Sequence, residues 1–297
     1  MRFPLSRAAI APCLAAVALA ACAKSEKAPA ADAPAAAATA APAAAAGSIP
    51  VVTITASDYK YDVPDTISAG MTTLKLVNKG PELHHVQLFR LTGGKTYADL
   101  VAGMKSMAPN TPLPPWIEVV AGPNAPVPGG ESSITEDLAA GNYALLCMIP
   151  STDHMPHFAK GMMHSLTVVP GTGTVAAAPT SDIKVTMSDY AWDVTPAISA
   201  GKHIIRVENT AAQQHEMFIV RLEKGKTPLD VATWAEAPNG PPPGMPLGGM
   251  SGMTKGAVAF VPVDLAPGEY ALICFLPDAK DGKAHYVHGM MKAFTVS

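Results

Sequence analysis

One strand-like motif occurs twice in this chain, as GNYALLC at residues 141–147 and as GEYALIC at residues 268–274. Both copies begin at a glycine, continue through tyrosine and apolar residues, and end on a cysteine. Tyrosine and branched apolar residues between turn residues favour a β-strand. The motif therefore predicts two equivalent strands, each with a cysteine at its end.

The repeat extends outward from this motif. Ser-Asp-Tyr at 57–59 recurs 131 residues later at 188–190, and the register slips by four residues in a Pro/Gly-rich stretch before the motif itself. Self-similarity of this kind is the signature of duplicated structural units. The sequence thus predicts one domain at 49–170 and a second at 182–297. A Gly/Ala/Pro/Thr linker at 171–181 joins them.

Each copy consists of short apolar stretches with β-type alternation, separated by turn residues. In the first copy they lie at 51–55, 73–77, 86–91, 143–148 and 165–169. One short helix per copy is expected, at 97–107 and at 228–237, the second with Thr227 as its N-cap. Many short strands between turns are typical of a sandwich or barrel, so the predicted fold class is all-β with two tandem β-sandwich domains.

The N-terminal segment has the composition of an export signal. Two arginines precede an apolar run at 8–21, which is too short to span a bilayer permanently. The run closes as LAAC at 19–22, which resembles the lipobox of bacterial lipoproteins and implies acylation of Cys22; an unmodified Cys22 after ordinary cleavage is the alternative. With the Ala/Pro-rich tether at 23–48, this predicts a cell-envelope protein anchored to a membrane by lipid, facing the periplasm or the cell surface.

Cysteine and histidine usage points to metal binding. Neither Cys147 nor Cys274 has a partner cysteine in its own copy, so a disulfide would have to join two equivalent strand ends. A thiolate metal ligand is the better interpretation. Each copy offers an early histidine, the cysteine, a later histidine and a methionine five residues after it: His84, Cys147, His157 and Met162, and His215, Cys274, His285 and Met290.

This order resembles the cupredoxins, the blue-copper family of plastocyanin and azurin. The copper site of that family takes an early histidine after an Asn-containing turn, and then Cys, His and Met from one loop between the last two strands. In this chain Asn78 and Asn209 precede the early histidines. The resemblance implies a Greek-key sandwich for each copy and one copper per domain, held by the eight residues above. Two imidazoles, a thiolate and a weak thioether suit both Cu(I) and Cu(II). The implied function is one-electron transfer, with a redox or copper-trafficking protein of the envelope as partner.

The loop between the cysteine and the later histidine is longer than in that family. Nine residues separate Cys147 from His157, and ten separate Cys274 from His285. Closing ten rather than three residues costs about 1 kcal/mol more in chain entropy. The insertion either forms a surface excursion that leaves the ligands converging, or it opens the site. A copper-handling lipoprotein without redox turnover and a metal-free interaction module are therefore the alternatives.

Several other functions lack support in the sequence. The net charge of −3 and the absence of a basic patch argue against a nucleic-acid partner. The His-x-His and His-Cys-His patterns that multicopper enzymes need are absent, as are phosphate-loop and nucleophile-elbow motifs. The sequence therefore predicts no catalytic activity of its own.

Some methionines and histidines remain outside the predicted ligand set. Met245, Met250 and Met253 lie in a Pro/Gly-rich stretch that is expected to be an exposed loop, with a copper-delivery surface as the alternative. His85 aligns with Glu216 of the second copy, so only His84 of the adjacent pair has a histidine counterpart. Three other histidines are expected to face solvent, with extra metal ligands as the alternative: His154, His164 and His288.

Overall fold

The structure is a computed structural model that describes residues 47–106, 111–172, 176–236 and 240–297. The predicted signal peptide, Cys22 and nearly all of the tether lie outside the described residues. The first half contains α1 (Tyr97–Ser106), a 3-10 helix (His157–Lys160) and the strands β1 (Val51–Ser57), β2 (Lys60–Asp62), β3 (Thr66–Ser68), β4 (Gly70–Asn78), β5 (Gln87–Leu91), β6 (Ile117–Val120), β7 (Glu131–Leu138), β8 (Gly141–Leu146) and β9 (Met163–Val169). The second half contains α2 (Pro228–Glu236), a 3-10 helix (His285–His288) and the strands β10 (Ile183–Ser188), β11 (Ala191–Thr195), β12 (Gly201–Asn209), β13 (His215–Leu222), β14 (Gly244–Met253), β15 (Val258–Leu265), β16 (Gly268–Ile273) and β17 (Met291–Val296).

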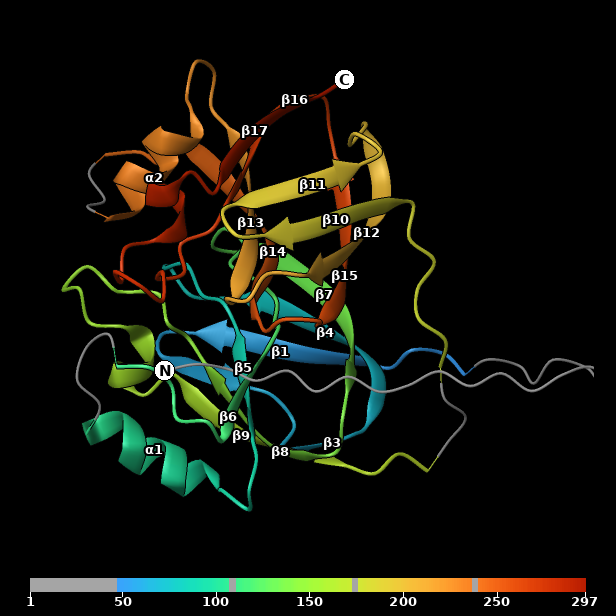
Figure 1. Cartoon of the computed structure of the whole chain (residues 1–297), viewed down its shortest axis with the longest axis vertical. Coiled ribbons are helices and arrows are strands. Elements are labelled where there is room, and N and C mark those ends of the chain that lie inside the picture. The colour runs from blue at the N-terminus through green and yellow to red at the C-terminus, as the bar shows by residue number, and fades with distance from the viewer. Residues whose placement is uncertain (1–46, 107–110, 173–175, 237–239) are drawn as a thin grey trace, which may run out of the picture. The chain divides into compact units, whose positions relative to one another are not determined.

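The strands form three sheets, and the two halves repeat one topology. One sheet of eight strands has the order β11-β10-β12-β15-β7-β4-β1-β2, so each half contributes four strands in mirrored order. The other sheets, β3-β9-β8-β5-β6 and β14-β13-β16-β17, belong to the first and second half (Figure 1). Because the chain crosses between sheets after β4, β6 and β7, and equivalently in the second half, each half is a Greek-key β-sandwich. The predicted all-β fold class with one helix per half is confirmed.

Alternating side chains fill the interior of each sandwich. Leu74 and Leu76 on β4, and Ile205 and Val207 on β12, point inward while their neighbours are partly exposed. Burying one leucine side chain completely contributes about 2 kcal/mol. The tyrosine of each repeated motif is also buried, and its hydroxyl donates a hydrogen bond to the carbonyl four residues upstream, at 2.8 Å in the first half and 2.7 Å in the second.

The two helices begin at matching caps. The Thr227 N–H donates to Asp230 at 2.7 Å, and the Asp230 N–H donates back to the threonine hydroxyl at 3.2 Å. Thr96 and Asp99 make the same reciprocal pair in front of α1. Such a box satisfies two otherwise free backbone donors. The predicted helices and the Thr227 cap are confirmed as far as the described residues reach.

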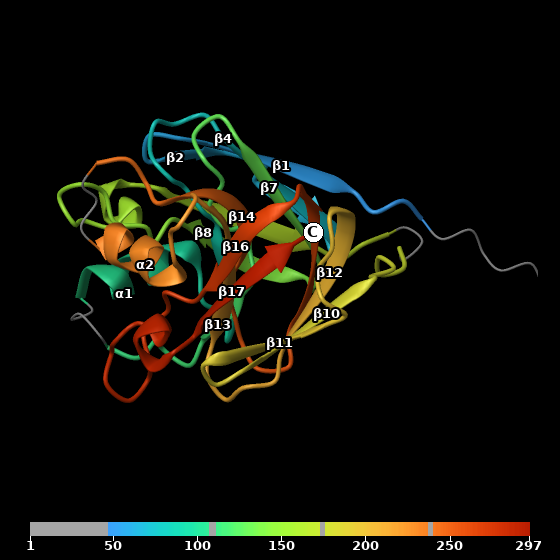
Figure 2. The same ribbon diagram turned by 90° about the horizontal axis from the view of Figure 1, so that it is seen from above.

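The two halves are joined through sheet and loop contacts. Strands β7 and β15 pair antiparallel at Thr135 and Phe260, and the first half's β4 and the second half's β12 lie on opposite sides of this pair (Figures 1 and 2). Ala45–Ser297 form one compact unit. The domain bounds given above stay a prediction.

Glu136 on β7 is buried without full hydrogen bonding and gives a stability prediction. Its Oε1 atom has no hydrogen-bond partner in the described part of the chain, and burial raises the pKa of its carboxyl well above the usual value. A raised folded-state pKa means that stability falls as the pH rises towards that pKa, since ionisation is easier in the unfolded chain. Glu136→Gln is therefore expected to stabilise the protein by about 1–3 kcal/mol near pH 7 and less near pH 4. Thermal denaturation at both pH values tests this, with Asp193→Asn, at an exposed position in the other half, as the control. Equal melting temperatures for Glu136→Gln and the parent at pH 7 would contradict it.

Candidate metal centres

Three predicted ligands of the first half meet at one buried point. Nδ1 of His84 and Nδ1 of His157 lie 3.1 Å apart, and the Cys147 Sγ lies 3.4 Å from the latter. All three side chains have an exposed fraction of 0%. The structure therefore assembles a compact two-imidazole, one-thiol group from residues 63 and 10 positions apart in the chain.

The second half repeats this group with the same atoms. Nδ1 of His215 and Nδ1 of His285 lie 3.0 Å apart, and the Cys274 Sγ lies 3.3 Å from Nδ1 of His285. In both halves the candidate donor atoms lie within 4.8 Å of one another. The His, Cys and His residues that were grouped from the sequence therefore lie together in both halves.

A buried asparagine presents the early histidine of each group. Asn78 ends β4, and its side chain accepts the Gly80 N–H at 3.0 Å and donates to the Glu82 carbonyl at 2.8 Å. Asn209 does the same in the second half, with Ala211 and Gln213. These bonds fix the turn after the strand, so the histidine that follows enters the sandwich at a defined place.

The long loop from the cysteine to the later histidine folds back on itself. In the first half Pro150 pairs with Pro156, and the His157 N–H donates to the Ile149 carbonyl at 2.9 Å. In the second half Pro277 pairs with Ala284, and the His285 N–H donates to the Leu276 carbonyl at 2.8 Å. The insertion is therefore a small surface excursion whose ends meet, and the ligands converge. This geometry decides between the two alternatives left open above.

The two predicted axial methionines lie beside their cysteines. Met162 and Met290 are fully buried, and their carbonyls accept the N–H of Cys147 and Cys274 at 3.2 Å each. Each follows a glycine with positive φ, 106° at Gly161 and 98° at Gly289, which ends the short 3-10 helix that carries the later histidine. Their role as ligands stays a prediction.

Burial sets the protonation of the donors. It lowers the pKa of His84 and of His285 to about 4, and it also lowers the pKa of His157 and His215. At neutral pH all four imidazoles are therefore in the neutral, ligating form. Burial raises the pKa of the Cys147 thiol to about 11, and that of Cys274 further. Metal loading must consequently release a proton from each thiol.

In each group a carboxylate accepts a hydrogen bond from Nε2 of one imidazole. Nε2 of His157 donates to Glu82 at 2.8 Å, and Nε2 of His215 donates to Asp189 at 3.3 Å. A proton fixed on Nε2 leaves the Nδ1 lone pair free for a metal and raises its basicity. The two centres differ here, because the later histidine is hydrogen-bonded in the first half and the earlier one in the second. In the second half the later histidine has a carboxylate only at ion-pair distance, with Asp278 at 3.9 Å from Nε2 of His285.

The residue that follows each early histidine is hydrogen-bonded to the backbone next to the cysteine. Nε2 of His85 accepts the Met148 N–H at 2.9 Å, and Oε1 of Glu216 accepts the Phe275 N–H at 2.7 Å. The backbones of His85 and Glu216 also hydrogen-bond Cys147 and Cys274. Sequence reasoning noted only that these two residues are aligned and differ. That alignment beside a ligand was the available signal for their role.

These donors fit copper. Imidazole suits copper and zinc alike, but two imidazoles and a thiolate with a methionine alongside form a soft set that favours copper. Two further polar atoms, Nε2 of His84 and Nε2 of His285, are buried without a hydrogen-bond partner among the described residues. A cation at Nδ1 keeps the proton on Nε2 and strengthens it as a donor. The carboxylate nearest to one of these atoms is Asp278, whose Oδ2 lies 3.9 Å from Nε2 of His285.

The remaining predicted residues fall elsewhere. Met250 and Met253 are fully buried in β14, so the predicted exposed loop is wrong there, whereas Met245 is 41% exposed. His154 is exposed as expected. The other two histidines are partly exposed and pair with carboxylates, His164 with Asp65 at 3.0 Å and His288 with Asp281 at 3.2 Å.

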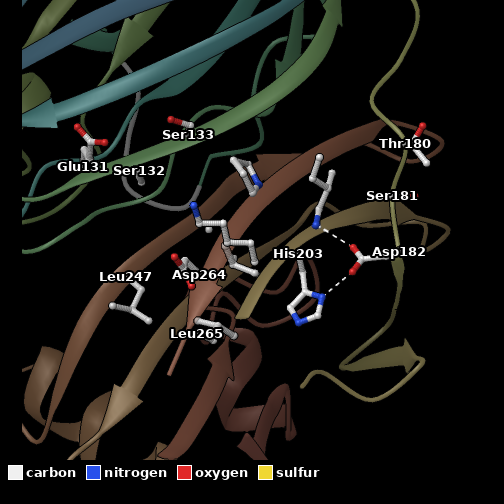
Figure 3. A pocket seen from close by; sticks show the side chains of 15 residues that line it. Glu131, Ser132, Ser133, Thr180, Ser181, Asp182, His203, Leu247, Asp264 and Leu265 are labelled. Atoms are coloured by element: carbon white, nitrogen blue, oxygen red, sulfur yellow. Dashed lines mark hydrogen bonds and ion pairs between the residues drawn. The ribbon is translucent and has the colours of Figure 1, made fainter. Parts of the chain in front are cut away.

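A groove of ≈ 830 Å³ lies away from the metal centres, and both halves contribute to its lining. Glu131, Asp182, His203 and Asp264 line it with several apolar residues, and Asp182 accepts the His203 Nδ1–H at 2.5 Å (Figure 3). None of the eight predicted metal ligands lines it.

Within the described part of the chain, helices are all too short or too polar to cross a bilayer.

Comparisons with known proteins add similar solved structures. No family model matches the chain, and no curated protein matches it. A reduced auracyanin from Roseiflexus castenholzii is 24% identical over 41% of this chain and 98% of its own, with a TM-score of 0.29. A multicopper oxidase is 15% identical over 83% of this chain and 88% of its own, with a TM-score of 0.25. A copper-containing nitrite reductase from Thermus scotoductus SA-01 is 11% identical over 84% of this chain and 62% of its own, with a TM-score of 0.23.

These similarities correct one prediction. The expectation that the chain has no catalytic activity is contradicted, because the similar structures include an oxidase and a reductase. The absence of further copper-binding motifs was too narrow a ground for it.

Proposed function

We propose that this chain is a two-centre copper protein that transfers single electrons in the cell envelope. The observation that carries the proposal is the convergence of two Nδ1 atoms and one Sγ, all buried, at the same place in both halves. Bound copper supplies the one-electron couple. Strand ends, short turns and the carboxylates beside His157 and His215 hold the imidazoles in place. Ligands held in this way need to move little between oxidation states, which favours electron transfer.

The burial of the donors also separates this function from the alternatives. Handing copper to a partner requires donors that a second protein can reach, whereas His84, Cys147 and their counterparts are 0% exposed. A metal-free interaction module gives no reason for three metal donors to converge in each half. Electron transfer tolerates burial because the electron, and not the ion, crosses the surface.

Potentiometric titration of the copper-loaded full-length protein tests the proposal. Two reversible one-electron steps per chain are expected, with copper retained in both oxidation states. Copper that leaves on reduction would instead support a copper-handling role, and reduction that cannot be reversed would overturn the electron-transfer proposal.

We further propose that Cys22 carries a lipid that anchors the protein to a membrane of the envelope and keeps it near a redox partner. The support is the LAAC sequence at residues 19–22 and the tether that follows it. Several acyl chains give effectively permanent attachment, whereas one gives marginal binding. Cys22→Ser is expected to move the protein from the membrane fraction to the soluble fraction. Retention of this variant in the membrane fraction would contradict the anchor.

A further inference from the structure

The two centres are linked by a buried polar chain that crosses between the halves. Asn124 lies in the loop between β6 and β7 and is 3% exposed. Its Nδ2 donates to Oε2 of Glu216 in the other half at 3.0 Å. In its own half the preceding residue, Pro123, accepts the Val86 N–H, next to His85, at 3.0 Å. The two-residue segment of Pro123 and Asn124 is therefore bonded next to His85 in one half and to Glu216 in the other.

Each end of this chain reaches a cysteine through two hydrogen bonds. His85 accepts the N–H that follows Cys147, and its backbone hydrogen-bonds the Cys147 thiol. Glu216 accepts the N–H that follows Cys274, and its backbone hydrogen-bonds the Cys274 thiol. Hydrogen bonds and dipoles around the cysteine sulfur are among the groups that set a copper centre's potential. A shift of either residue therefore alters the surroundings of its sulfur.

Neighbouring contacts keep Asn124 in place. Its N–H donates to the Gly249 carbonyl at 3.1 Å, and its carbonyl accepts the Ser132 hydroxyl at 2.6 Å. Its Oδ1 accepts the Ala125 N–H at 2.8 Å. With backbone and side chain both held, a displacement at His85 is passed to Glu216 rather than absorbed by a mobile loop.

We infer that Asn124 is a positioning residue that couples the two metal centres through His85 and Glu216, so that the state of one centre shifts the reduction potential of the other. This inference rests on the proposed function, because it concerns the potentials of the same two centres. It also requires a direct structural role that does not depend on any metal, namely that Asn124 holds Glu216 against the Phe275 N–H.

A double-mutant cycle tests the coupling. The potential of the second centre is measured with and without Cys147→Ser, in the parent and in the Asn124→Leu variant. We expect Cys147→Ser to shift this potential in the parent and to leave it unchanged when Asn124 is replaced. Asn124→Asp, which keeps the size but loses the Nδ2 donor to Glu216, is expected to abolish the shift as well and covers the case in which the leucine variant does not fold.

The control separates coupling from general loosening between the halves. Gln87 donates a buried hydrogen bond to the Gly252 carbonyl of the other half at 2.9 Å but takes no part in the chain through Asn124. Gln87→Leu should leave the Cys147→Ser shift intact. A shift that persists in both Asn124 variants, or that disappears equally in Gln87→Leu, overturns the inference.

Amide hydrogen exchange in the metal-free protein distinguishes failure of this inference from failure of the proposed function. Loss of the Asn124 bond is expected to speed exchange of the Phe275 N–H roughly fivefold, the factor that corresponds to about 1 kcal/mol for one hydrogen bond. If copper does not load but Phe275 responds, the proposed function is wrong while the structural link holds. Unchanged exchange at Phe275 contradicts the link whatever the copper result.

Discussion

Cys147→Ser is expected to remove one of two bound coppers and about half of the intense visible thiolate-to-copper absorption. The serine hydroxyl is a harder, far less acidic donor, and it cannot provide the thiolate that a His₂Cys centre requires. Among the described residues no second thiol lies at this centre, because Cys274 belongs to the other one. Copper analysis and the visible spectrum of the full-length protein measure both effects.

The duplication supplies matched controls for this experiment. Cys274→Ser should remove the other half of the absorption, and the double variant should remove all of it. Met250→Leu alters a buried methionine that lies outside both ligand sets and should change neither copper content nor spectrum. An undiminished spectrum in either single cysteine variant would mean that the thiol in question is only part of the core.

Glu82→Gln is expected to weaken Cu(II) binding at the first centre by about 10–100-fold, the range found when a group that orients a metal-binding histidine is changed. The Glu82 carboxylate accepts the His157 Nε2–H at 2.8 Å. Glutamine preserves the size and an acceptor oxygen but removes the charge that raises the basicity of Nδ1. Because Cu(II) depends on this charge more than Cu(I) does, the reduction potential of the first centre should rise.

The asymmetry between the halves makes this prediction specific. The second centre should be unaffected by Glu82→Gln and should respond to Asp189→Asn, since Asp189 holds His215 there. Glu118→Gln removes a carboxylate that pairs with Arg90 and serves as the control for charge alone. Competition titrations with a copper chelator measure the affinities. Equal losses at both centres after Glu82→Gln would contradict the assignment.

Much of the fold followed from the sequence because the informative features are local. The repeated strand motif, the alternation around Leu74 and Leu76, and the Thr227 cap act over a few residues, and each recurs where predicted. The sets built on Cys147 and Cys274 could be grouped from residue type and order alone. The duplication helped, because it showed which histidine of the pair at 84 and 85 has a counterpart.

The features that escaped prediction depend on contacts between distant segments. Strand β14 looks like a loop because it is rich in glycine and proline, yet a side chain at Gly249 would lie 2.0 Å from the Met217 carbonyl of the neighbouring strand. Its glycines thus permit close pairing. Glu82, Asp189 and Asn124 gain their roles only when turns and loops from separate parts of the chain are packed together.

X-ray absorption at the copper edge of the copper-loaded, full-length protein is the most direct test of the two-centre assignment. Two coppers per chain are expected, each with two imidazole nitrogens and one short copper–sulfur bond in its first coordination sphere. Copper bound through nitrogen and oxygen alone, with no short bond to sulfur, would show that the buried His84, Cys147 and His157 group and its counterpart are not the metal centres.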